Sequence, residues 1–250
     1  MADRPGGDRR VAVVTAPIIL WDIDGTLLRA PGSGVAAFRQ SIRAHTGKEL
    51  GKGPYDLGGR TDPDIARTLL EAIGHGGDDA LLAAVLAGVI EAYASLDGEL
   101  RASLLVMPGI PAMIAALADL DAHQSLLTGN LRAVAERKLA AGGLDGVLHV
   151  DSGAYGSDHA DRAVLARLAI SRCADALGRP IDPASVWVVG DTPRDLACAR
   201  AVGARCALVA TGTYAHDTLA GLGADAVFTD LADTATVLAA LTALAALAAR

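Results

Sequence analysis

The sequence has few of the residue types that mark disulfide-rich, zinc-stapled or nucleic-acid-binding proteins. Its three cysteines, Cys173, Cys198 and Cys206, are odd in number and have no C-x-x-C spacing, which argues against a disulfide framework and against a structural zinc site. We expect free, buried thiols in a reducing cytoplasm. The net charge is −7 and the isoelectric point is near 5.3, so the basic face that nucleic-acid binding needs is not expected.

Long hydrophobic runs are also scarce, although hydrophobic residues make up 52% of the chain and aromatic residues only 3%. The apolar run at 234–249 is mostly Ala and Leu, and it is shorter than the roughly 20 residues that span a membrane. A basic pair precedes the apolar stretch 11–21, but that stretch contains Pro17 and leads straight into two aspartates, unlike a signal peptide. We expect a cytoplasmic protein with no membrane partner and a disordered leader at 1–10.

The most informative stretch is an apolar run that ends in two carboxylates. Residues 18–21 read Ile-Ile-Leu-Trp, and Asp22-Ile23-Asp24-Gly25-Thr26 follows them. Alternate residues of a strand share a face, so Asp22 and Asp24 can enter one site at the strand's C-terminal end, where open α/β sheets bind ligands. Two close carboxylates are costly without a cation or a proton, which favours a divalent metal beside a carboxylate nucleophile. Taken alone, the run is also compatible with a structural turn.

The hydrophobic pattern predicts a helical segment followed by alternating strands and helices. Apolar residues recur at helical spacing through 33–103, with a glycine-rich loop at 47–59. The later alternation of strands and helices predicts a parallel sheet with helices on both faces. The expected strands are at about 17–23, 125–128, 147–150, 186–189, 206–210 and 226–228, and the expected helices of this part are at about 110–117, 131–140, 160–177, 193–202 and 232–249.

Four patches at expected strand ends, taken in order, resemble the motifs of the haloacid dehalogenase-like (HAD) hydrolase superfamily. The first is the D-x-D-G-T run at Asp22, and the fourth is Gly190-Asp191-Thr192-Pro193-Arg194-Asp195, similar to G-D-[ST]-x-x-D. The second is Thr128-Gly129-Asn130, where the family places a Ser or Thr that binds the phosphoryl group. Alone, T-G-N reads as a turn and Asp191 as a helix N-cap. Their order along the chain makes the resemblance specific, and it implies a HAD-like Rossmannoid α/β fold.

The third patch departs from the family pattern. The family usually has a lysine there, at a helix N-terminus, but Lys48, Lys52 and Lys138 lie outside this segment. The resemblance makes Arg162 the substitute, because an arginine keeps the charge and adds a planar fork suited to phosphate. Arg167 is the alternative, and a solvated helix charge is the plain structural interpretation of Arg162.

The resemblance implies a Mg²⁺-dependent phosphatase that hydrolyses a small-metabolite phosphomonoester through an aspartyl-phosphate. Asp22 would attack the phosphoryl group, and Asp24 would protonate the leaving oxygen and then activate water. The group that binds and stabilises the phosphoryl group would consist of Thr128, Gly129, Asn130 and Arg162. The implied metal ligands are Asp22, Asp24 (through its backbone carbonyl), Asp191 and Asp195, the last as ligand or as an orienting residue.

The position of the helical segment implies a C1 cap, which in this superfamily is inserted just after the first motif. The expected organisation is an α/β core at 11–32 and 104–250 with an all-helical cap at 33–103. The cap segment Gly58-Gly59-Arg60-Thr61-Asp62 resembles one found near the substrate in capped phosphatases and mutases, so Arg60 and Thr61 are candidates for substrate binding. Capping of the next helix by Thr61 or Asp62 explains these residues equally well.

Several functions share parts of this pattern. The phosphoglycolate phosphatase-like branch is the nearest resemblance, and a phosphomutase similar to β-phosphoglucomutase has the same core motifs. Dehalogenases of the superfamily lack the second aspartate, Asp24, and are disfavoured. The complete motifs argue against an inactive binding module, and no G-x-G-x-x-G follows a strand, which argues against dinucleotide binding. The sequence leaves the substrate and the oligomeric state open.

Overall fold

A five-stranded parallel sheet forms the centre of the molecule in the computed structural model, which describes residues 16–51, 53, 55 and 57–243. The strand order is β4-β1-β5-β6-β7. The first strand of the sheet along the chain, β1, therefore lies between the next two, β4 and β5. The strands are β1 (Ile18–Trp21), β4 (His123–Leu126), β5 (Val186–Gly190), β6 (Arg205–Val209) and β7 (Ala226–Phe228).

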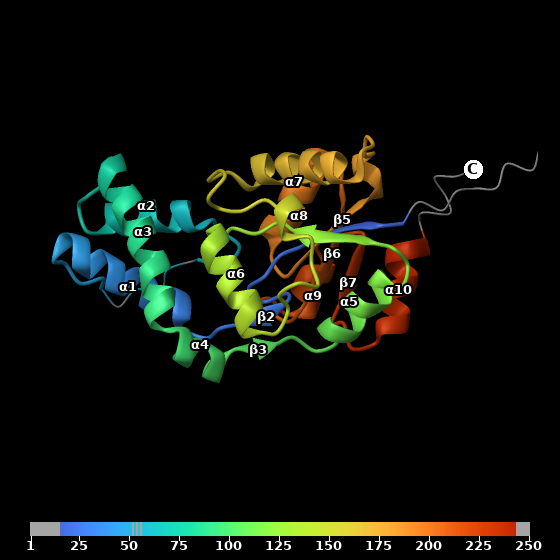
Figure 1. The fold of residues 1–250 in the computed structure, drawn as a ribbon, viewed down its shortest axis with the longest axis horizontal. Coiled ribbons are helices and arrows are strands. Elements are labelled where there is room, and N and C mark those ends of the chain that lie inside the picture. The colour runs from blue at the N-terminus through green and yellow to red at the C-terminus, as the bar shows by residue number, and fades with distance from the viewer. Residues whose placement is uncertain (1–15, 52, 54, 56, 244–250) are drawn as a thin grey trace, which may run out of the picture.

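Alternate residues of β1 enter two separate hydrophobic cores, one on each face of the sheet. Ile19 and Trp21 pack with α5, α6 and α10, whereas Ile18 and Leu20 pack with α7, α8 and α9. Figure 1 shows these helices on both faces of the sheet. A strand covered on both sides must be apolar throughout, which is why β1 reads Ile-Ile-Leu-Trp. The helices are α5 (Ile110–Ala118), α6 (Arg132–Ala141), α7 (Arg162–Leu177), α8 (Pro193–Val202), α9 (His216–Ala220) and α10 (Thr234–Ala243).

Four helices between the first and second strands of the sheet form a cap at one end of the molecule (Figure 1). They have a core of their own, to which Phe38, Leu69 and Val89 contribute. A short antiparallel pair, β2 (Leu28–Arg29) with β3 (Leu105–Val106), connects the cap to the sheet. The cap helices are α1 (Ser33–Thr46), α2 (Asp62–Ala72), α3 (Asp79–Ser95) and α4 (Asp97–Ser103). The predicted α/β fold with an all-helical cap after the first strand is confirmed.

The structure corrects one predicted strand. Where a strand was expected at 147–150, the chain instead leads into a 3₁₀ helix at Val150–Ser152. The His149 N–H donates to the Gln124 carbonyl (2.8 Å), and Ala154 forms an isolated bridge with Leu127, so this segment contacts the edge of β4 without continuing the sheet. The short helix α9 was not predicted. The leader at 1–10 and the end of the predicted C-terminal helix lie outside the described residues.

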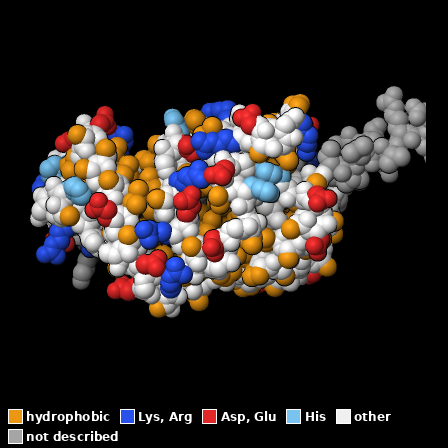
Figure 2. Space-filling view, in the orientation of Figure 1, with side chains coloured by type: hydrophobic (Ala, Val, Ile, Leu, Met, Phe, Trp, Pro, Cys, Tyr) orange, Lys and Arg blue, Asp and Glu red, His pale blue; other side chains and the backbone are white. Residues whose placement is uncertain are grey.

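Two surface properties bear on partners. On the face shown in Figure 2, basic and acidic side chains are interspersed rather than gathered by sign. Within the described ranges, no single helix is long and apolar enough to cross a membrane, and only the bent pair α3 with α4 reaches that length and composition when both are taken together.

Candidate active site

Three aspartates meet at the carboxyl ends of β1 and β5. Asp22 directly follows β1, Asp191 directly follows β5, and Asp195 lies in the first turn of α8. All three are buried, and one carboxylate oxygen from each lies within 4.8 Å of the others. An all-oxygen donor set of this kind suits Mg²⁺. The residues present therefore fit the metal that the sequence predicts.

Two glycines make room for the carboxylate of Asp191. Gly25 has a φ of +87°, and a Cβ atom there would lie 2.5 Å from Oδ2 of Asp191. A Cβ atom on Gly212 would lie 1.6 Å from the same oxygen. Any side chain at either position would displace Asp191. The third residue of this corner, Thr26, donates a hydrogen bond from Oγ1 to Oδ1 of Asp191 (3.4 Å).

Burial makes the negative charges of this aspartate cluster unfavourable unless a proton or a cation balances them. Burial, opposed by the Arg162 charge and reinforced by Asp195 and Asp24, raises the pKa of Asp22 to about 7. Burial and the neighbouring carboxylates of Asp22 and Asp195 raise the pKa of Asp191 to about 8. Like charges in a desolvated site favour protonation or a bound cation. The cluster therefore has the electrostatic character of a metal site.

Arg162 is the guanidinium that faces these aspartates. It is the first residue of α7, its side chain is 9% exposed, and its Nη2 lies 3.8 Å from Oδ1 of Asp22. The same nitrogen donates to Oδ1 of Asp195, while Oδ2 of Asp195 accepts from the N–H (3.0 Å) and the hydroxyl (2.7 Å) of Thr192. Thr192 and Asp195 form the capping box of α8. The alternative cation, Arg167, is exposed further along α7.

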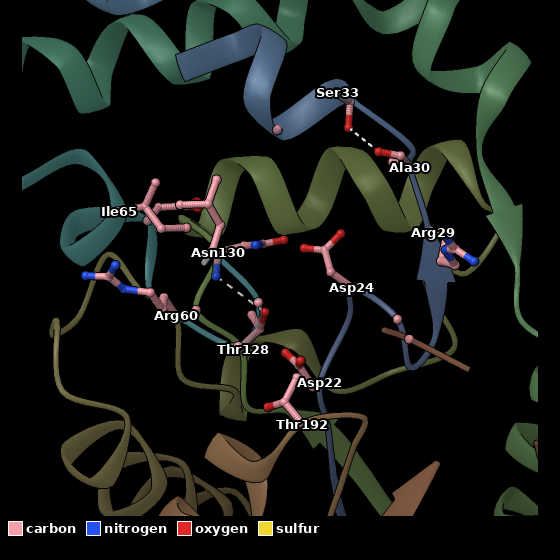
Figure 3. A pocket seen from close by; sticks show the side chains of 18 of the residues that line it. Asp22, Asp24, Arg29, Ala30, Ser33, Arg60, Ile65, Thr128, Asn130 and Thr192 are labelled. Carbon is pink, nitrogen blue, oxygen red and sulfur yellow. Dashed lines mark hydrogen bonds between the residues drawn. The ribbon is translucent and has the colours of Figure 1, made fainter. Parts of the chain in front are cut away.

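The second-motif residues line the same cavity as Asp22. Thr128 is buried, and its Oγ1 accepts from the Asn130 N–H (3.3 Å), as Figure 3 shows. The carbonyl of Gly129 accepts from the Asp62 N–H (2.8 Å), and a carboxylate oxygen of Asp62 accepts from the Leu131 N–H (2.7 Å). These bonds fix the loop that carries Thr128 against the first residues of the cap helix α2.

Lys138 is a site residue that sequence reasoning missed. Its Nζ donates to both carboxylate oxygens of Asp24 (2.8 and 2.6 Å), and its side chain is 4% exposed. Burial opposes the charged form, but Asp24, Tyr93 and Asp62 hold the pKa of Lys138 above its usual value. One signal was available: Lys138 lies on the inward face of α6, three and four residues after the buried Ala135 and Val134.

The cap residues Arg60 and Thr61 both have partners inside the protein. Thr61 caps α2 by accepting from the Asp64 N–H (3.4 Å), and its hydroxyl donates to the Ala160 carbonyl (2.9 Å). Arg60 donates from Nε to Asp64 (2.6 Å) and from Nη2 to Thr68 (2.6 Å). This geometry supports the helix-capping interpretation of Thr61, and it leaves Arg60 as a residue of the cavity wall.

A cavity of about 370 Å³ lies between the cap and the strand ends (Figure 3). Asp22, Asp24 and Thr128 line its core side, and Tyr93 and Ile65 line its cap side. Its volume is in the range of small-molecule sites. A small substrate bound there would contact both parts of the protein. The predicted site residues that line it are Asp22, Asp24, Arg60, Thr128, Gly129, Asn130, Arg162 and Asp191.

The family model of haloacid dehalogenase-like hydrolases matches residues 19–200 of this chain. The chain belongs to this family. The match includes all four motifs, from the strand before Asp22 to the helix that carries Asp195. No curated protein matches the chain in sequence.

Solved structures share the fold of this HAD hydrolase at low identity. CbbY from Rhodobacter sphaeroides, in complex with phosphate, has a TM-score of 0.70 and 19% identity over 87% of this chain and 96% of its own. A predicted phosphoglycolate phosphatase from Haemophilus somnus has a TM-score of 0.65 and 15% identity over 89% and 97%. A putative β-phosphoglucomutase from Bacteroides vulgatus has a TM-score of 0.68 and 16% identity over 92% and 90%. These likenesses extend over the cap as well as the sheet.

Proposed function

We propose that this HAD hydrolase is a Mg²⁺-dependent cytoplasmic phosphatase that hydrolyses the phosphomonoester of a small metabolite through an aspartyl-phosphate. The observation that carries the proposal is the buried cluster of Asp22, Asp191 and Asp195, which faces Arg162 at the base of the cavity between the cap and the strand ends. Carboxylates and a guanidinium in this arrangement can bind a metal and a phosphoryl group together. The binding of phosphate by CbbY, a protein of the same fold, supports the proposal.

The chemistry uses two aspartates in two roles. A carboxylate oxygen of Asp22 attacks phosphorus, the bond to the leaving oxygen breaks, and Asp24 gives that oxygen a proton. Asp24 then takes a proton from the water that hydrolyses the aspartyl-phosphate, which returns Asp22 and releases phosphate. Arg162 and the Thr128 hydroxyl bind the equatorial phosphoryl oxygens. Asp22 and Asp191, with the Asp24 backbone carbonyl, would hold Mg²⁺, which would supply positive charge to neutralise the phosphoryl group.

Asp195 is proposed to orient the metal site rather than to complete it. Both of its carboxylate oxygens already have partners, with Thr192 on one and Arg162 on the other. Such a residue fixes the arginine and the start of α8 next to Asp191.

The direct test is phosphate release from a panel of small phosphoesters, with Mg²⁺ and with EDTA. We expect Mg²⁺-dependent release from at least one ester. Transfer of the phosphoryl group to a second hydroxyl, with turnover only after a bisphosphate primer is added, would instead identify a phosphomutase. Absence of both activities in the folded protein would contradict the proposed function.

Replacing Arg162 by Ala is expected to lower kcat by roughly 10²-fold, the usual effect of losing one group that stabilises transition-state charge. The exposed Arg167 on the same helix provides the matched control, and Arg167→Ala should leave kcat unchanged. Steady-state kinetics of both variants, with melting temperatures to verify folding, measure the difference. Equal losses in the two variants would remove Arg162 from the proposed site.

A further inference from the structure

We infer that Lys138 is a positioning residue, which holds the carboxylate of Asp24 at the place where the leaving oxygen of the substrate emerges. The inference rests on the proposed function and adds a residue to it. Lys138 lies on α6, outside the four motifs, and 114 positions from Asp24 along the chain.

Asp24 needs such a residue because the surrounding backbone and side chains leave almost half of its side chain exposed and able to change rotamer. It lies on the loop after β1, and its side chain is 45% exposed toward the cavity. In Figure 3 its carboxylate lies on the cap side of Asp22, on the side of the cavity where the rest of a substrate attacked by Asp22 would lie. Proton transfer requires the two oxygens to come within hydrogen-bond distance, roughly 2.6–3.2 Å. A carboxylate that sampled several rotamers would seldom meet that requirement.

Lys138 restrains the carboxylate of Asp24 through hydrogen bonds. Its ammonium group has three N–H donors, and all three have acceptors: the two oxygens of Asp24 and Oδ1 of Asn130, at 2.9 Å. The ammonium also lies 5.5 Å from the centre of the Tyr93 ring, which the cap helix α3 contributes. The four-carbon stem is buried, so the charge cannot follow Asp24 into solvent. The geometry therefore restrains Asp24 rather than Lys138.

The ion pair between Lys138 and Asp24 is expected to contribute more to activity than to the stability of the fold. Asp24 is exposed enough that water replaces the ammonium group if Lys138 is removed. The buried carboxylate of Asp62, which the charge of Lys138 also stabilises, keeps its hydrogen bond from the Leu131 N–H (2.7 Å). Methionine at position 138 keeps the length of the stem and removes the charge. We therefore expect Lys138→Met to fold. Arg137 is the control, since it is the neighbouring cation on α6, its side chain is 39% exposed and it points to Asp97 of the cap (3.9 Å).

The test compares substrates whose leaving groups differ in their need for a proton. With an alkyl phosphate, Lys138→Met should lower kcat by roughly 10²-fold and change KM by less than about twofold, because the carboxyl group that exchanges protons with the leaving oxygen and with water is no longer held in place. With p-nitrophenyl phosphate, whose leaving group departs without a proton, the first-turnover release of nitrophenol should fall by less than about threefold. Arg137→Met should match the parent with both esters.

A double-mutant cycle decides whether Lys138 acts through Asp24. In an Asp24→Asn background, Lys138→Met should change the residual rate by less than about twofold. Additive losses, or equal losses with alkyl and aryl phosphates, would overturn the positioning role while leaving the phosphatase proposal intact. A parent protein with no Mg²⁺-dependent turnover of any ester would overturn the proposed function itself, and the role of Lys138 with it.

Discussion

The Asp22→Asn variant is expected to lose at least roughly 10³-fold in kcat with every phosphoester, and to form no phosphorylated enzyme. An amide has no negative oxygen with which to attack phosphorus, and its geometry otherwise matches the carboxylate. The position of Asp22 supports the proposed role of nucleophile. It follows directly from β1, it is buried, and Arg162 faces it across 3.8 Å.

Mass spectrometry of acid-quenched protein measures the intermediate directly. The parent should carry one phosphoryl group on the peptide that contains Asp22 during turnover, and the variant should carry none. Asp22→Asn should fold at least as well as the parent at pH 8, since it removes a buried carboxylate whose pKa burial has raised to about 7. Comparable rates in variant and parent would remove Asp22 from the role of nucleophile.

The second large effect is expected when the metal is withdrawn. EDTA should abolish turnover, and Asp191→Asn should raise the Mg²⁺ concentration needed for half-maximal activity by roughly 10²-fold, since one anionic ligand is lost. The exposed aspartate Asp145 provides the control, and Asp145→Asn should leave the Mg²⁺ requirement unchanged.

The same cluster predicts a pH dependence of stability. Burial, with like charges nearby, raises the pKa of Asp22 to about 7 and of Asp191 to about 8, above the value of about 4 for an unfolded aspartate. The native metal-free protein therefore binds more protons than the unfolded chain between these values, and its free energy of unfolding falls as the pH rises from about 5 to about 8. Mg²⁺ relieves the repulsion, so it should raise the melting temperature by several degrees at pH 8 and much less at pH 5.

Thermal unfolding with Mg²⁺ or EDTA at three pH values measures this effect. Asp191→Asn should flatten the pH dependence in EDTA and remove most of the response to Mg²⁺. If Mg²⁺ stabilised the parent equally at pH 5 and pH 8, the acidic cluster would not be its binding site.

Features set by neighbouring residues were accessible from the sequence alone. The apolar run before Asp22 predicts a strand buried on both faces, because a strand flanked by two layers of helices has no polar side. The sequence offers Asp191 as the N-cap of the following helix, and the structure has the N-cap one residue later, at Thr192, which forms a capping box with Asp195. The order of the four motifs along the chain was sufficient to place the chain in its family.

Features that depend on contacts between distant segments needed the tertiary structure. The segment before Val150 has the apolar character of a strand, but its backbone meets only the edge of β4, so it ends in a 3₁₀ helix. The sequence left Arg162 and Arg167 as two candidates for the third-motif cation. The packing of α7 against α8 places Arg162 next to Asp195.

Lys138 illustrates most clearly the difference between what the sequence predicts and what only the tertiary structure shows. The sequence placed it on a helix and outside the third motif, which is where it lies. Its contact with Asp24 joins segments 114 positions apart, and a long flexible side chain can reach many partners from one backbone position. The sequence by itself therefore determined the family, through the resemblance of its motifs, and the aspartates at the strand ends, through apolar runs and short spacing. Only the tertiary structure decided which cations face those aspartates, because that choice depends on how the helices pack.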